Sequence, residues 1–165
     1  MKFLCLLCCV FAIITVKGQN TKPCSAPEIK QFDFWVGDWN LTWSDTLHGV
    51  NKIEKIMDGC ALQENFYDPR LKYVGKSWSV YNPNSKQWQQ TWVDNGGAYI
   101  ALTGGMLGDS MVLTTQETTT PTGKTKSRMV YYNITPQSFI WNWESSTDGG
   151  QTWKLNWKIN YQRKK

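Results

Sequence analysis

Polar side chains alternate with large apolar ones in several segments of this sequence, and the spacing could place acids and amides on an apolar surface. In an extended chain every second side chain points to the same face, so Gln90 shares a face with Trp88 and Trp92. By the same rule Glu64 shares a face with Phe66. A carboxyl group held against apolar side chains can perform general acid or base chemistry, and an amide can orient a bound ligand.

Two further charged residues, Arg128 and Glu144, share faces with Val130 and Asn142 respectively. A buried charge needs a partner, so if these faces point inward we expect two of the carboxylates of Glu54, Glu64 and Glu144 to pair with Arg128. Three alternatives stay open at this point: a functional polar cluster inside the fold, a purely structural buried pair, and exposure of these faces to solvent.

The single histidine, His48, limits the metal and haem chemistry that the chain can support. It falls in the polar stretch 45–49 between two predicted strands, whereas a haem ligand is held on a rigid inner face. Cys24 and Cys60 are far apart and lack partner ligands for zinc. His48 also lacks the nucleophile elbow of a serine hydrolase. We therefore predict no metal site and no cofactor.

The elements that must position these side chains are β-strands. The 165 residues include ten tryptophans, seven tyrosines and six phenylalanines, most of them in short segments with a period of two. Ten segments follow this pattern: 39–44, 52–57, 60–67, 72–81, 87–94, 98–104, 109–116, 125–133, 138–145 and 152–162.

Turn signals between these segments favour hairpins between sequence neighbours, for example at Asn82-Pro83-Asn84 and in the Asp-box pattern of residues 146–153. Closing such a meander removes its open edges. The predicted fold class is therefore all-β, an antiparallel up-and-down β-barrel of about eight to ten strands, with a two-sheet sandwich as the alternative. One short N-terminal helix is predicted over 26–33, where Ser25 and Glu28 have the spacing of a capping box.

Residues 1–18 have the layout of a signal peptide, with one lysine before an apolar run that is too short to span a membrane comfortably. We expect cleavage near Gly18 and Gln19, a secreted protein (extracellular or periplasmic), and one domain over 19–165. Cys24 and Cys60 remain after cleavage. An oxidising destination favours a disulfide between them, and the competing interpretation is that Cys60 is a buried small apolar residue.

The sequence Gly37-Asp38-Trp39 contains the G-x-W motif, and Arg163 lies near the end of the last predicted strand. In calycin-type barrels, lipocalins among them, this tryptophan packs on an arginine from the last strand, so the analogy makes Trp39 and Arg163 the barrel-closing pair. The ordered motifs FDFWVGDW, GCALQENF, SWSVYNPNSKQWQQTWVD, GGMLGDSMVL and WNWESSTDGGQTW resemble the secreted DUF1579-type lipocalin-like proteins over nearly the whole mature chain. The resemblance implies the barrel and secretion, and it brings no activity, ligand or catalytic residue. A more distant similarity to nitrobindin, a ten-stranded haem barrel, raises haem only as a hypothesis.

The leading functional hypothesis is a secreted lipocalin-like barrel that binds a small hydrophobic or amphipathic molecule. The formal charge of +5 comes mostly from scattered residues, which does not favour nucleic acid as a partner. One alternative is an enzyme of isomerase or hydratase type with Glu64 or Glu144 as general base, which we consider less favoured than binding. The other is an interaction scaffold with a filled barrel. The predicted ligand-binding residues are Trp78, Trp92, Trp143, Trp157, Gln90, Arg128 and Glu64.

Overall fold

The structure is a computed structural model that describes residues 24–44, 46–121 and 123–165. The predicted signal peptide and its cleavage site lie outside the described residues. Two 3₁₀ helices, η1 (Pro27–Trp35) and η2 (Met57–Gly59), accompany the strands. The strands are β1 (Gly37–Trp43), β2 (Thr46–Ile56), β3 (Ala61–Asp68), β4 (Tyr73–Asn82), β5 (Gln87–Asp94), β6 (Tyr99–Leu107), β7 (Ser110–Thr115), β8 (Thr118–Thr120), β9 (Gly123–Tyr132), β10 (Ser138–Ser146) and β11 (Lys154–Arg163).

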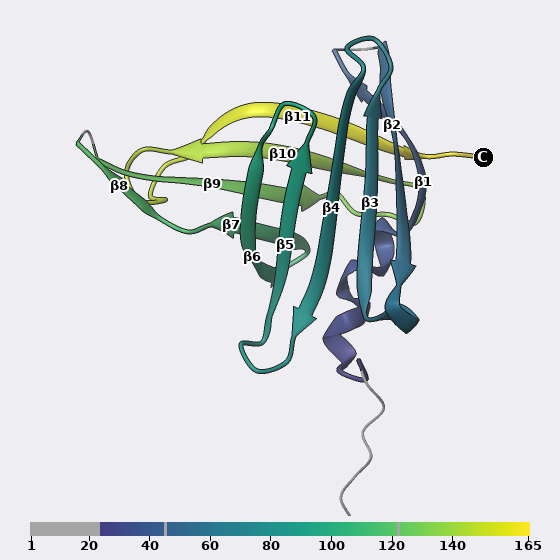
Figure 1. Cartoon of the computed structure of the whole chain (residues 1–165), viewed down its shortest axis with the longest axis horizontal. Coiled ribbons are helices and arrows are strands. Elements are labelled where there is room, and N and C mark those ends of the chain that lie inside the picture. The colour runs from purple at the N-terminus through teal and green to yellow at the C-terminus, as the bar shows by residue number, and fades with distance from the viewer. Residues whose placement is uncertain (1–23, 45, 122) are drawn as a thin grey trace, which may run out of the picture.

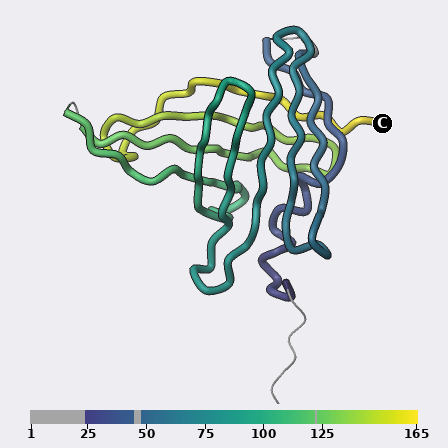
Figure 2. Tube along the Cα trace, viewed as in Figure 1, coloured from purple at the N-terminus to yellow at the C-terminus, as the bar shows by residue number. Residues whose placement is uncertain are grey.

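Ten of these strands close into an antiparallel barrel, which confirms the predicted fold class. Strands β1 to β7 pair in chain order, β7 pairs with β9, β9 with β10, β10 with β11, and β11 returns to β1. The short strand β8 adds a hairpin to the start of β9. Strands β2 to β5 cross β9 to β11 at a steep angle (Figure 1), and the chain trace shows the same crossing (Figure 2). Strand pairing joins the two groups into one sheet.

Helix η1 fills one end of the barrel with aromatic side chains. Phe32 and Trp35 are fully buried, and the Phe32 ring packs edge-on against Trp88 and Tyr131, with ring centres 4.9 and 5.4 Å apart. The predicted capping box is wrong, because the helix begins one residue later, after Ala26, and no side chain caps it. The helix nevertheless occupies the place predicted for it, and it closes this end of the interior.

The predicted seam between the first and last strands is present. Trp39 and Arg163 are register partners of β1 and β11, and the guanidinium carbon lies 4.2 Å from the centre of the Trp39 ring. Arg163 also donates hydrogen bonds to the carbonyl oxygens of Phe34 (3.2 Å), Val36 (2.9 Å) and Pro136 (2.7 Å).

Gly37 explains the glycine of the motif. Its φ of +130° disfavours any side chain, and a Cβ there would collide with Nη1 of Arg163. The glycine therefore makes room for the arginine that closes the barrel.

Cys24 and Cys60 form a disulfide, with Cα atoms 5.2 Å apart. The bond ties the start of the described chain to the residue that follows η2. In the chain-entropy model, closing a loop of this length stabilises a fold by about 4 kcal/mol. The bond therefore fixes the segment that leads into η1.

His48 lies inside strand β2, so its predicted position in a loop is wrong. The strand begins at Thr46, six residues before the predicted segment 52–57. It contains a β-bulge in which Leu41 pairs with Gly49 and Thr42 pairs with Leu47, so that His48 is the extra residue. The imidazole is buried and stacks on Trp43 at 4.5 Å. Within the described part of the chain, no helix has the length and apolar character needed to cross a membrane.

Candidate functional site

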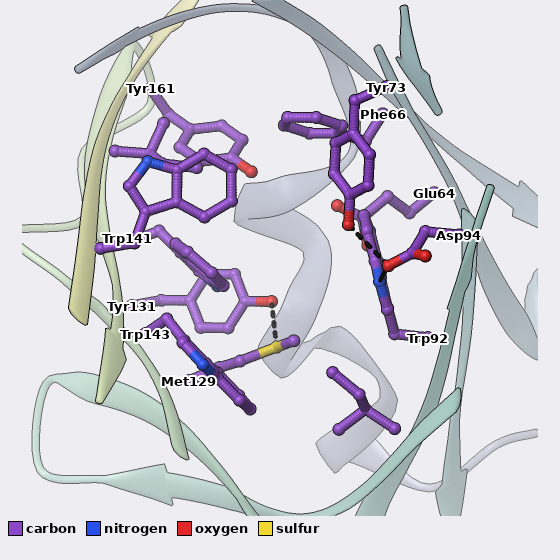
Figure 3. A pocket seen from close by; sticks show the side chains of 13 residues that line it. Glu64, Phe66, Tyr73, Trp92, Asp94, Met129, Tyr131, Trp141, Trp143 and Tyr161 are labelled. Atoms are coloured by element: carbon purple, nitrogen blue, oxygen red, sulfur yellow. Dashed lines mark hydrogen bonds between the residues drawn. The ribbon is translucent and has the colours of Figure 1, made fainter. Parts of the chain in front are cut away.

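The barrel interior contains a cavity of about 160 Å³. One side of Tyr131 lines this cavity, and the other side packs against η1. An engineered cavity of roughly 150 Å³ binds benzene, so this space suits a molecule built around one small ring. Figure 3 shows side chains of β3 to β5 facing those of β9 to β11 across it. The lining residues are Glu64, Phe66, Tyr73, Trp92, Asp94, Ile100, Met129, Tyr131, Trp141, Trp143, Trp157, Ile159 and Tyr161.

Burial divides this lining into a floor and a mouth. Seven residues are buried and form the floor: Glu64, Phe66, Met129, Tyr131, Trp141, Ile159 and Tyr161. Six are half-buried and reach toward solvent: Tyr73, Trp92, Asp94, Ile100, Trp143 and Trp157. The cavity therefore has an apolar, mostly aromatic wall, with one carboxyl group at its floor and another at its mouth.

Glu64 supplies the carboxyl group of the floor. The side-chain amide of Asn51 donates to Oε1 at 2.6 Å, and the Ser77 hydroxyl donates to Oε2 at 2.5 Å. Burial raises the pKa of Glu64 to about 7, and the hydrogen bonds from Ser77 and Asn51 oppose this rise without cancelling it. Near neutral pH this carboxyl group can therefore either hold or release a proton.

A row of polar side chains on neighbouring strands holds Glu64 in place. Gln90 donates to the hydroxyls of Ser77 (3.2 Å) and Ser79 (3.0 Å), and Ser77 in turn donates to Glu64. Asn51 also donates to the Tyr161 hydroxyl at 3.2 Å, which links this row to the opposite wall. The carboxyl group of Glu64 is thus fixed by neutral donors before any ligand arrives.

Asp94 supplies the carboxyl group of the mouth. Its Oδ2 accepts hydrogen bonds from the Tyr73 hydroxyl (2.6 Å) and from Nε1 of Trp92 (3.0 Å). Its Oδ1 accepts from the backbone N–H groups of Gly96 and Ala98. Burial alone would raise the pKa of Asp94, but these hydrogen bonds outweigh it and the pKa is lowered. Asp94 is therefore an ionised carboxylate at neutral pH.

The structure places four of the seven predicted ligand-binding residues in the cavity lining: Glu64, Trp92, Trp143 and Trp157. Gln90 is buried one step behind this wall, where it orients Ser77. Trp78 was predicted to line the cavity, and this is wrong, since its side chain is 40 % exposed on the outer face of β4. The buried residues of β4 alternate with it, and they are the small ones, Gly75, Ser77 and Ser79.

Arg128 and Glu144 do pair, but not inside the barrel. Their Nε and Oε2 atoms are 2.6 Å apart, and the Arg128 guanidinium lies 4.1 Å from the centre of the Trp153 ring. Arg128 neighbours Met129 along β9, and Met129 lines the cavity, so alternation turns Arg128 outward. The prediction that Arg128 orients a ligand is therefore wrong, and Glu144 is not available as a base in the cavity.

No protein-family model matches the chain, and a comparison with curated proteins finds no match. In the described ranges, no group of three or more histidine, cysteine, aspartate or glutamate side chains is arranged to hold a metal ion. The interpretation of the site therefore depends on its own geometry: a ring-sized aromatic cavity, one fixed carboxyl group of raised pKa and one ionised carboxylate.

Proposed function

We propose that this chain is a secreted, lipocalin-like member of the DUF1579-type proteins that binds a small hydrophobic or amphipathic molecule in its barrel. The predicted signal peptide and the Cys24–Cys60 disulfide support the secreted location, since such bonds persist in oxidising compartments. The closed barrel and the G-x-W seam support the lipocalin-like assignment.

The observation that carries the binding proposal is the contrast between the two ends of the interior. The end next to η1 is packed with aromatic rings, whereas the other holds a cavity of about 160 Å³ walled by eight aromatic side chains. A concave, mostly apolar space with a few fixed polar groups is the usual form of a small-molecule site. A barrel that served only as a scaffold has no need of such a space.

Gly75 offers a way to block the cavity without removing a lining side chain. The Trp92 ring lies directly over Gly75, so a Cβ at this position would collide with the ring. We expect Gly75→Ala to push Trp92 into the cavity and to weaken binding of benzyl alcohol, a neutral probe of suitable size, at least tenfold by titration calorimetry.

Gly105→Ala is the matched control, because a Cβ at Gly105 meets no atom within 4 Å. It should bind benzyl alcohol as the wild-type protein does. Unchanged binding in the folded Gly75→Ala variant would place the probe elsewhere, and the binding proposal would then lose its site.

A second candidate function rests on Glu64 alone. A carboxyl group with a pKa of about 7 at the floor of a cavity is suited to remove a proton from a bound substrate near neutral pH. We expect such an enzyme to catalyse exchange of the α-hydrogens of a small cyclic ketone with deuterated water, followed by NMR. Glu64→Gln should abolish the exchange, whereas equal exchange in the two folded proteins would exclude Glu64 as the base.

A further inference from the structure

The cavity carries negative charge that no basic side chain compensates. Two of its lining residues are acids, Glu64 and Asp94, and none is lysine, arginine or histidine. The partners of Glu64 are the neutral side chains of Asn51 and Ser77. The partners of Asp94 are also uncharged: the Tyr73 hydroxyl, the Trp92 indole N–H and two backbone N–H groups. The ion pairs found among the described residues involve neither acid.

The aromatic side chains that line the rest of the cavity also favour a positively charged ligand. Figure 3 shows Glu64 and Asp94 on one side of the cavity, facing Trp141, Trp143 and the tyrosines of the opposite wall. Aromatic rings attract cations to their electron-rich faces, by about 0.5–2 kcal/mol for each well-placed pair. A cation in this space would lie between carboxyl groups on one side and aromatic rings on the other.

The same arrangement disfavours an anion. A ligand carboxylate would approach the carboxylate of Asp94 and the carboxyl group of Glu64, with no arginine or lysine in the lining to receive it. Like charges in a partly desolvated site repel each other, and an unpaired buried charge is costly. The cavity is therefore unsuited to the head group of a fatty acid or another anionic amphiphile.

We propose that the cavity selects a small organic cation, an amine or quaternary ammonium group carried on an apolar body of about one ring, with Glu64 and Asp94 as the groups that recognise its charge. This inference depends on the proposed binding function and names the chemical class of its ligand. Glu64 lies at the deep end, fixed by Asn51 and Ser77, and Asp94 lies at the mouth.

Binding of a cation should depend on pH, because it favours the ionised form of Glu64. The titratable groups that face Glu64 are Tyr73 on β4, Asp94 on β5, Tyr131 on β9 and Tyr161 on β11. Burial raises the pKa of each of these tyrosines, and the hydrogen bond and charge of Asp94 (for Tyr73) and the negative charge of Glu64 raise it further, so they stay neutral. Asp94 stays ionised. Of these cavity groups, Glu64 is therefore the one whose charge changes between pH 5.5 and pH 8.

The test uses three probes of nearly equal size and different charge: benzylamine (cation), benzyl alcohol (neutral) and benzoate (anion). Titration calorimetry at pH 8 should give benzylamine at least about tenfold tighter binding than benzyl alcohol, and no detectable binding of benzoate. Benzylamine should bind about tenfold more weakly at pH 5.5 than at pH 8, whereas benzyl alcohol should bind equally at both.

Two variants assign the selectivity to the named carboxyl groups. Glu64→Gln and, independently, Asp94→Asn should each weaken benzylamine binding about tenfold at pH 8 while leaving benzyl alcohol within about twofold. Glu54→Gln is the control, because Glu54 is an exposed partner of Lys52 and does not line the cavity. It should leave the binding of both probes unchanged.

The outcomes separate this inference from the proposed function. Equal affinity for benzylamine and benzyl alcohol, or tighter binding of benzoate, would overturn cation selection and leave the small-molecule cavity in place. Failure of all three probes to bind the wild-type protein would contradict the binding function itself. Loss of benzylamine binding in Glu54→Gln would show that the selectivity comes from the overall charge of the protein.

Discussion

The Glu64→Gln variant is expected to be more stable than the wild-type protein at pH 8, by roughly 2–4 kcal/mol, and similar to it at pH 4. Burial raises the pKa of Glu64 from an ordinary 4.5 to about 7 in the folded chain. At pH values below the pKa of Glu64 in the unfolded chain, the carboxyl group is protonated in both the folded and the unfolded chain. As the pH rises from 4.5 to 7, the unfolded chain loses this proton while the folded chain keeps it, so the stability of the wild-type protein falls.

Glutamine has the shape of the protonated acid and carries no charge, so the stability of the variant does not fall in this way as the pH rises. Chemical denaturation of both proteins at several pH values between 4 and 8 measures the difference directly, and the titration of other groups cancels in the comparison. The exposed Glu54→Gln variant should show no such trend. A stability difference between Glu64→Gln and the wild-type protein that stays constant with pH would mean that Glu64 titrates as an ordinary carboxyl group.

The second large effect is expected at the barrel seam. Arg163→Met should lower the free energy of unfolding by roughly 2–4 kcal/mol, because it removes the cation–π contact with Trp39 and leaves three carbonyl oxygens without their donor. Methionine keeps much of the length of the side chain, so the loss reports on the guanidinium group and not on a large cavity.

Lys164→Met is the matched control, since Lys164 is the next residue along the chain and its side chain is exposed. Denaturant titration of both variants should show a clear shift of the midpoint only for Arg163→Met. Stability within about 0.5 kcal/mol of the wild-type protein would show that β1 and β11 are held by their backbone hydrogen bonds alone.

The fold could be predicted because its signals are local. Alternation along each strand and turn residues between strands depend only on sequence neighbours, and they predicted ten barrel strands. The pairing of Trp39 with Arg163 came from a motif whose physical reason is visible in the structure: Gly37 makes space for the arginine. The helix cap was wrong because the helix is a 3₁₀ helix that begins one residue later than predicted. The position of His48 was wrong because β2 begins at Thr46, six residues before the predicted segment, and continues through a β-bulge at His48.

The site could be predicted only in part, because alternation gives two faces and does not say which one points inward. In β4 the larger Trp78 is outside, and the small residues Gly75 and Ser77 are inside. The reason is volume: Trp92 and Gln90 on β5 fill the space that these small residues leave. Small residues that alternate along one strand, next to a strand rich in tryptophan, were the signal that could have placed β4 correctly.

Asp94 was missed for a different reason. It precedes Asn95-Gly96-Gly97, so in the sequence it is typical of a turn residue, and it does accept hydrogen bonds from the turn backbone. Its role as the carboxylate at the cavity mouth depends on the Tyr73 hydroxyl. Tyr73 lies 21 positions earlier in the chain, and its hydroxyl reaches Asp94 across the β4–β5 hairpin. No pattern within one strand shows such a contact.

Intermolecular NOEs to a bound probe would show whether the cavity between β3–β6 and β9–β11 holds the ligand. Ile100, Met129 and Ile159 place methyl groups around the cavity, whereas Met57 and Leu107 are exposed on the outside of the protein. We predict that bound benzylamine gives NOEs to the first three residues and none to the other two. NOEs to Met57 or Leu107 alone, or none to any lining methyl group at saturating benzylamine, would contradict binding in the cavity.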